Sequence, residues 1–180
     1  PLKATDYKMS IMSPRKEGDL LYAGGEGAFG VMIKLAADKP EAKELWRGTK
    51  KNGIYPMTMT PIIEDGHMYG VDQTGHLRCM KMDTGERLWE SDVPFDGKAA
   101  NAGTAFIVKN GDRFFLFTEK GDLIIAKLSP KGYEEISRAK ILEPTLTAFG
   151  RQVVWSHPAF ADGCMFARND KEIVCVSLKK

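Results

Sequence analysis

The chain has 180 residues, of which 43% are hydrophobic and 28% are charged, and this composition suits one globular domain with a hydrophobic core. Its 26 basic and 24 acidic residues give a net charge of +2, which argues against a general attraction to nucleic acid or to a membrane surface. No apolar run approaches the roughly 20 residues that a transmembrane helix needs, so no membrane span is expected.

Three cysteines, Cys79, Cys164 and Cys175, are too few and too widely spaced for a disulfide scaffold or a zinc site. The chain begins at Pro1 and shows no segment in which basic residues precede an apolar run, as a signal peptide would. We therefore expect a fragment or a processed product.

The first repeat begins at Ser13 and reads SPRKEGDLLYAGGEGAFGVMIKLAADKPEAKELW, ending at Trp46. It contains a literal G-x-G-x-x-G between Gly25 and Gly30, which could indicate a dinucleotide-binding turn. That interpretation needs a long helix and further alternating strands and helices, but Pro40 ends the next segment and nothing downstream has that order. We instead place these glycines in a hairpin between a second and a third strand.

The second repeat, residues 60–89, shows the pattern most clearly. Turn sequences EDG, DQTG and DTG separate segments rich in Val, Ile, Tyr and Met, and no helical period persists. The pattern predicts four short strands: Pro61–Glu64, His67–Val71, His76–Met82 and Arg87–Ser91.

The same order recurs from Thr104 and again from His157, where the repeat reaches the end of the chain. Glycines at the first turn of the four repeats are spaced by 66−18 = 48, 111−66 = 45 and 163−111 = 52 residues. A period of roughly 40–50 residues with four strands per unit is typical of a β-propeller. The sequence therefore predicts an all-β propeller of four-stranded antiparallel blades, one domain over residues 1–180, with blades at approximately 9–48, 57–92, 103–142 and 155–180.

The run GHMYGVDQTGHLRCMKMDTGERLW resembles the repeat of the pyrroloquinoline-quinone-like (PQQ-like) β-propellers. That repeat has a G-x-x-Y strand, a G-x-L strand and then A-x-D-x-x-T-G-x-x-x-W, the tryptophan-docking pattern. Thr84, Gly85 and Trp89 match the docking pattern, and Trp46 is the equivalent one blade earlier. The resemblance implies that both tryptophans pack between neighbouring blades.

The match has three departures. Cys79 replaces the small alanine, and Lys81 replaces the aspartate, which puts the aspartate's docking hydrogen bonds in doubt. The third repeat has Ile136 near the expected tryptophan position.

For function, the resemblance leaves two classes open. Quinone-dependent dehydrogenases on this fold bind PQQ with a calcium ion and often carry an adjacent-cysteine disulfide, which this chain lacks, and they have eight repeats. Many relatives are instead binding or assembly scaffolds, such as the bacterial outer-membrane-protein assembly lipoprotein. We favour a non-catalytic ligand- or protein-binding propeller with no cofactor and no metal site, and an exported or periplasmic location follows from the resemblance alone. The alternative is a fragment of a PQQ-dependent dehydrogenase.

The residues that enter the first strand of each blade are the candidates for a ligand site. In propellers these entries line the central funnel, and three of the four here have proline after a polar residue, which holds that residue extended. We expect the four side chains to converge near the axis, although they could merely cap strands: Ser13, Thr60, Thr104 and His157. No catalytic residue is assigned.

Cys164 and Cys175 fall on consecutive strands of the last repeat. A two-residue turn at Asn169-Asp170 would place them opposite each other, at a spacing a little long for a disulfide. We favour a buried pair of thiols over a bond between them.

The final repeat stops at Leu178, where its fourth strand would begin. We therefore expect an open arc of about four blades, the C-terminal part of a larger propeller whose remaining blades, or another protein, are its partners. The strand Ile173–Leu178 would then be an exposed edge. The competing interpretation is a four-bladed ring closed by Leu2–Met9.

Overall fold

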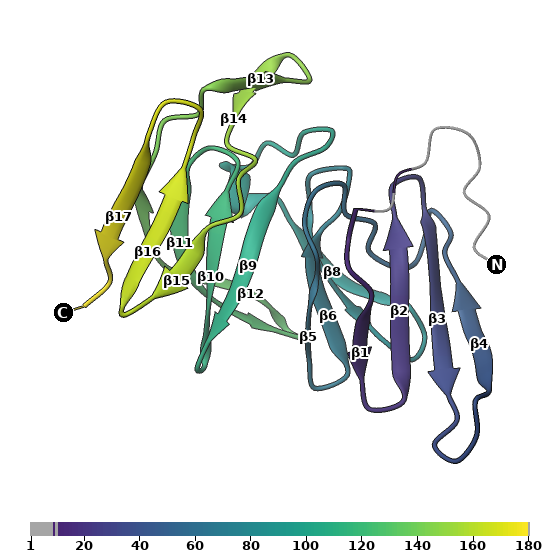
Figure 1. Ribbon diagram of the computed structural model, residues 1–180. Helices are drawn as coiled ribbons and strands as arrows, with labels where there is room; N and C mark the ends of the chain where they lie inside the picture. Colours follow the sequence, from purple (N-terminus) through teal and green to yellow (C-terminus); the bar gives the residue numbers. More distant parts are fainter. Residues whose placement is uncertain (1–8, 10, 180) are drawn as a thin grey trace.

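The computed structural model describes residue 9 and residues 11–179, and its regular elements are strands and one short 3-10 helix. Four antiparallel sheets, blades 1 to 4, follow one another along an arc, with blade 1 and blade 4 at opposite ends (Figure 1). In each sheet the strands lie side by side in chain order, as propeller blades do.

Blades 1 to 3 each have four strands. Blade 1 consists of β1 (Arg15–Glu17), β2 (Leu20–Gly25), β3 (Phe29–Leu35) and β4 (Ala42–Arg47). Blade 2 consists of β5 (Ile62–Glu64), β6 (His67–Val71), β7 (Leu77–Lys81) and β8 (Arg87–Ser91), followed by η1 (Val93–Phe95). Blade 3 consists of β9 (Ala105–Asn110), β10 (Arg113–Thr118), β11 (Asp122–Ser129) and β12 (Gly132–Lys140).

Blade 4 has three strands within the described residues: β15 (Ala159–Ala161), β16 (Cys164–Arg168) and β17 (Ile173–Ser177). No described strand pairs with the outer edge of β17, and Ile173 on that strand is 75% exposed. Residues 1–8 lie outside the described part of the chain, so the alternative of closure by Leu2–Met9 is not tested. The described residues form an open arc.

The first hairpin of every blade has a two-residue turn that contains the periodic glycine. In blades 2 and 4 the turns are Asp65-Gly66 and Asp162-Gly163, and all four residues have positive φ, between 48° and 73°. Two positive φ values define the type I′ turn, whose twist matches that of the flanking strands. In blades 1 and 3 the glycine comes first in the turn, and Gly18 and Gly111 also have positive φ, so the glycine period marks a positive-φ position in the first hairpin turn of every blade.

A β-bulge recurs between the third and fourth strands of the complete blades. In blade 1 Met32 pairs with Trp46 and Ile33 pairs with Glu44, so one residue is left over. The leftover residues in blades 1 to 3 are Leu45, Leu88 and Ile136. By this register the tryptophan position of blade 3 is occupied by Ser137, one residue beyond the expected Ile136.

The hydrophobic core lies between the blades. Blades 1 and 2 enclose a cluster of buried residues that is rich in methionine, including Met32, Met68 and Met80, with Tyr22. Methionine fills irregular gaps because it is unbranched and flexible. A larger cluster, in which Phe117 and Leu116 are fully buried, joins blades 2, 3 and 4.

A hairpin between blades 3 and 4 was not predicted. It consists of β13 (Leu146–Ala148) and β14 (Arg151–Val153) and projects above blades 3 and 4 at the top of the view (Figure 1). The extra residues explain why the glycine spacing rises to 52 at this point while the other two spacings are 48 and 45.

The expected pairing of the two C-terminal cysteines is wrong. Arg168 pairs with Ile173, and this register places Cys164 opposite Ser177 and Cys175 opposite Phe166. Both cysteines are free, and Cys175 is exposed, so they are not a buried pair. The turn lies one residue later than expected, because Asn169 accepts hydrogen bonds at its Oδ1 from the backbone N–H groups of the residues at 171 and 172, at 2.8 and 2.9 Å.

Candidate functional site

The four predicted funnel residues lie at the entries to β1, β5, β9 and β15, the first strand of each blade. The Ser13 backbone N–H donates to Thr60 Oγ1 at 3.1 Å, which joins the entries of blades 1 and 2. Thr104 has no exposed surface, and its hydroxyl pairs with that of Thr58 in the linker between blades 1 and 2. The His157 ring lies 4.8 Å from the Phe106 ring of blade 3.

These contacts place each of the four entry residues beside a neighbouring blade or linker. Because Thr104 is fully buried, it cannot touch a ligand in this conformation. Ser13 and His157 are exposed and Thr60 is partly exposed. Convergence of the four side chains on one ligand site stays a prediction.

The two tryptophans of the docking pattern each cross to the next blade. Trp46 of β4 donates its Nε1–H to the Met82 carbonyl of blade 2 at 2.8 Å, and Trp89 of β8 donates to the Ser129 carbonyl of blade 3 at 2.8 Å. The Trp46 ring also covers Gly85, where an added Cβ would lie 2.9 Å from the ring. The implied packing between neighbouring blades is therefore present.

The turn that receives Trp46 closes without the aspartate of the family pattern. The Gly85 N–H donates to the Lys81 carbonyl at 2.9 Å, and the Glu86 N–H donates to Thr84 Oγ1 at 3.3 Å. The Lys81 side chain pairs with Glu86 at 2.8 Å instead. The substitution at position 81 thus leaves the turn held by backbone bonds and a surface ion pair.

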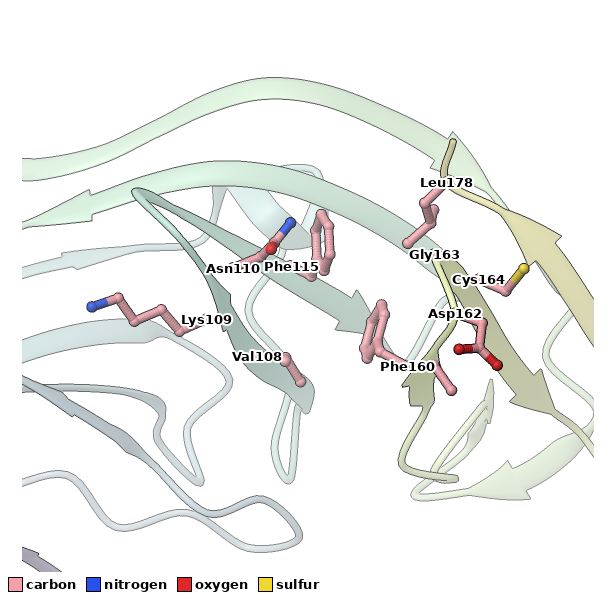
Figure 2. A pocket seen from close by; sticks show the side chains of 10 residues that line it. Val108, Lys109, Asn110, Phe115, Phe160, Asp162, Gly163, Cys164 and Leu178 are labelled. Carbon is pink, nitrogen blue, oxygen red and sulfur yellow. The ribbon is translucent and has the colours of Figure 1, made fainter. Parts of the chain in front are cut away.

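Between blades 3 and 4 no tryptophan is supplied, since Ser137 stands at that position. A groove of about 400 Å³ lies between these blades, lined by residues of β9, β10, β15, β16 and the segment after β17 (Figure 2). The Phe115 and Phe160 rings stack at 5.1 Å and form part of its lining. We name this space the blade 3–4 groove.

A buried ion-pair cluster in blade 2 was missed at the sequence level. Asp72, 2% exposed, pairs with Arg78 at 3.0 Å and with Arg87 at 3.5 Å, and it accepts the Tyr55 N–H at 3.1 Å. Desolvation by burial, with the nearby Arg78 charge, lowers the pKa of Arg87. Arg87 also donates to the Gly53 carbonyl at 2.7 Å, so the cluster fastens the linker from blade 1 onto blade 2.

A second missed feature anchors the β13–β14 hairpin. Arg151 of the hairpin makes two bonds to the buried Glu119 carboxylate, at 2.8 and 3.0 Å, and Trp155 Nε1 donates to the same carboxylate at 3.2 Å. The tip residue Phe149 is 55% exposed, and Leu146 is 41% exposed. The hairpin is therefore an anchored projection with an apolar tip, and the longer glycine spacing was its one signal in the sequence.

Within the described part of the chain, no three His, Cys, Asp or Glu side chains gather as a metal site would require. None of the described segments forms a helix with the length and apolarity that crossing a bilayer requires.

Comparison with known proteins places the chain among propellers. The family model described as outer membrane protein assembly factor BamB matches residues 10–180. No curated protein matches the chain. The crystal structure of BamB from Moraxella catarrhalis has a TM-score of 0.59 at 17% identity, covering 94% of this chain and 43% of that one.

Two computationally designed proteins also match. Ika4 has a TM-score of 0.59 at 9% identity, covering 99% of this chain and 96% of that one. Ika8 has a TM-score of 0.54 at 10% identity, covering 91% and 44% respectively. At these identities the likeness is one of fold, and the chain spans less than half of the BamB and Ika8 structures.

Proposed function

Because the chain belongs to the family of the outer membrane protein assembly factor BamB, a family of PQQ-like β-propellers, we propose that it is a non-catalytic scaffold that binds another protein. Fold alone does not assign a function, since propellers carry both enzymes and binding proteins. The proposal therefore depends on a particular surface as well as on the family.

The observation that carries the proposal is the β13–β14 hairpin. Phe149 at the turn and Leu146 at the start of β13 expose apolar surface, while Arg151 ties the hairpin to the buried Glu119. A rigid aromatic side chain held out from a fixed support loses little conformational entropy when a partner covers it. Such a hairpin suits contact with a protein surface.

The partners that fit are proteins, including further blades of a longer propeller against the β17 edge, where backbone groups face outward without a described partner strand. The family membership supports an exported or periplasmic location in a bacterium.

Site-specific photo-crosslinking in producing cells tests the scaffold function. A benzoylphenylalanine at position 149 is expected to crosslink to one or a few defined proteins. The matched control is the same group at Ile136, which is 43% exposed on the outer strand β12. Equal, diffuse crosslinking from both positions, or none from position 149, would overturn the role of the hairpin.

Calorimetric titration with PQQ and calcium tests the alternative of a quinoprotein fragment. We expect no saturable heat from the cofactor. Stoichiometric binding would instead favour the dehydrogenase class and replace the proposal.

A further inference from the structure

We propose that the blade 3–4 groove binds an aromatic side chain, tryptophan above all, that a partner polypeptide presents. The inference rests on the proposed function as a protein-binding scaffold and adds to it a site and the chemistry of its ligand. It does not depend on the β13–β14 hairpin.

The two other blade junctions show what such a space accepts. At the first junction the Trp46 ring lies 5.6 Å from the Tyr22 ring of its own blade and donates its N–H to Met82 of the next blade. At the second, the Trp89 ring lies 6.2 Å from Tyr69 and donates to Ser129. At each junction the tryptophan therefore has two neighbours. One is an aromatic ring on the second strand of its own blade, and the other is a backbone carbonyl near the end of the third strand of the next blade.

Both halves of this arrangement recur at the third junction. Phe115 pairs with Ile125 as Tyr69 pairs with Cys79, so Phe115 is the aromatic neighbour. The Leu178 N–H donates to the carbonyl of Gly163 at 2.8 Å, as the Met82 N–H donates to that of Gly66 at 2.9 Å. By this register the Leu178 carbonyl corresponds to the acceptor that Trp46 uses.

The third junction lacks the indole. Ser137, an exposed residue, replaces the tryptophan, and Leu178 and Phe115 both line the groove that remains. Its volume of about 400 Å³ lies within the range of roughly 300–1,000 Å³ that is usual for ligand pockets.

The lining suits an aromatic ring with one polar edge. The stacked Phe115 and Phe160 rings offer an apolar face, because aromatic rings favour offset or tilted contact with one another. Val108 adds a further apolar wall, while Asp162 and Cys164 lie at one side of the groove (Figure 2). A tryptophan would place its ring against the apolar residues Phe115, Phe160 and Val108 and its N–H toward a carbonyl. A purely aliphatic side chain has no N–H to donate.

The test uses the chain's own docking sequence as the probe. A synthetic peptide copying residues 86–92 carries Trp89, and a matched peptide has alanine in place of that tryptophan. Nuclear magnetic resonance titration is expected to show saturable shifts at Val108, Phe115, Phe160 and Leu178 with the first peptide and not with the second. Equal shifts with both peptides, or shifts confined to other blades, would overturn the proposal.

Substitutions at two positions test whether the peptide binds in this groove. Ser137→Trp should fill the groove from within, raise the melting temperature and reduce peptide affinity at least tenfold, while Ser137→Ala should change neither. Phe160→Ala should weaken peptide binding by removing one aromatic wall and not by filling the groove. Thermal denaturation checks that this variant is folded. Unchanged affinity in both Ser137→Trp and Phe160→Ala would overturn the site, while crosslinking at position 149 would still report on the scaffold function separately.

Discussion

Trp89 of blade 2 donates its indole N–H to the carbonyl of Ser129 in blade 3, at 2.8 Å, across a junction between two sheets that share no strand pairing. Trp46 makes the equivalent bond to Met82 one junction earlier. The repeat thus joins each of these blades to its successor through one side chain.

We expect Trp89→Phe to lower the free energy of unfolding by about 0.5–1.5 kcal/mol, because it keeps a ring and removes the hydrogen bond. Trp89→Ala removes the packing as well and should cost about 2–3 kcal/mol, less than the loss of a fully buried tryptophan because the side chain is partly exposed. Urea denaturation measures both. As a control, the free energy of unfolding of Ile136→Ala, on the exposed bulge of blade 3, should stay within about 0.5 kcal/mol of the parent. A loss of stability at Ile136 as large as the loss at Trp89 would contradict a special role for the docking bond.

At Gly85 a side chain would meet two obstacles: the residue has a φ of 73°, and the Trp46 ring occupies the space that an added Cβ would need. Gly66 has a φ of 71° with nothing within 4 Å of an added Cβ, so it is a matched control. Gly66→Ala should cost about 1 kcal/mol from backbone strain alone, and Gly85→Ala should cost about 1–3 kcal/mol more from contact with the ring.

Denaturation of both variants, each made with and without Trp46→Ala, measures the coupling. The excess cost at Gly85 should vanish when the ring is absent, as a double-mutant cycle would show. A cost at Gly85 that is independent of residue 46 would mean that the strain arises from the turn alone.

Much of the fold could be read from the sequence because its signals are local. Turn glycines such as Gly66 and Gly163 have positive φ, which residues other than glycine rarely adopt, so their spacing gives the blade period directly. The strands of the second repeat likewise follow from their flanking turns, and β6 and β8 have the expected bounds.

The misses share a different origin, which is dependence on partners that the sequence does not show. The turn after β16 shifted by one residue because the Asn169 side chain accepts two backbone bonds and stays outside the turn. A single bulged residue moved the tryptophan position of blade 3 from Ile136 to Ser137. The buried Thr104 hydroxyl pairs with that of Thr58, which comes from the linker between blades 1 and 2. The position of Thr104 at the entry to its blade therefore could not predict whether a ligand can reach it.

The final prediction concerns the three free thiols, whose environments differ. Burial raises the pKa of Cys79 to about 11, whereas Cys175 is exposed on the edge strand β17. A thiol reacts as its thiolate. In the native protein Ellman's reagent should therefore modify Cys175 first and Cys164, which is partly exposed, more slowly, while Cys79 should react only on unfolding. Three thiols in denaturant without reductant are expected, and only one would reveal a Cys164–Cys175 bond.

The pH dependence of the fast phase tests whether the exposed Cys175 interacts with the partly exposed Cys164. Desolvation, and then the neighbouring Cys164 thiol, raise the pKa of Cys175, so its reaction rate should reach half its maximum at a higher pH than that of a free cysteine, about 8.5. Removing the neighbouring thiol with Cys164→Ala should move this midpoint to lower pH, because Cys164 then no longer raises the pKa of Cys175. Cys79→Ser is the control and should leave the midpoint unchanged. If Cys164→Ala also leaves it unchanged, the two side chains do not interact in solution, and the diagonal contact between β16 and β17 is too loose to influence their chemistry.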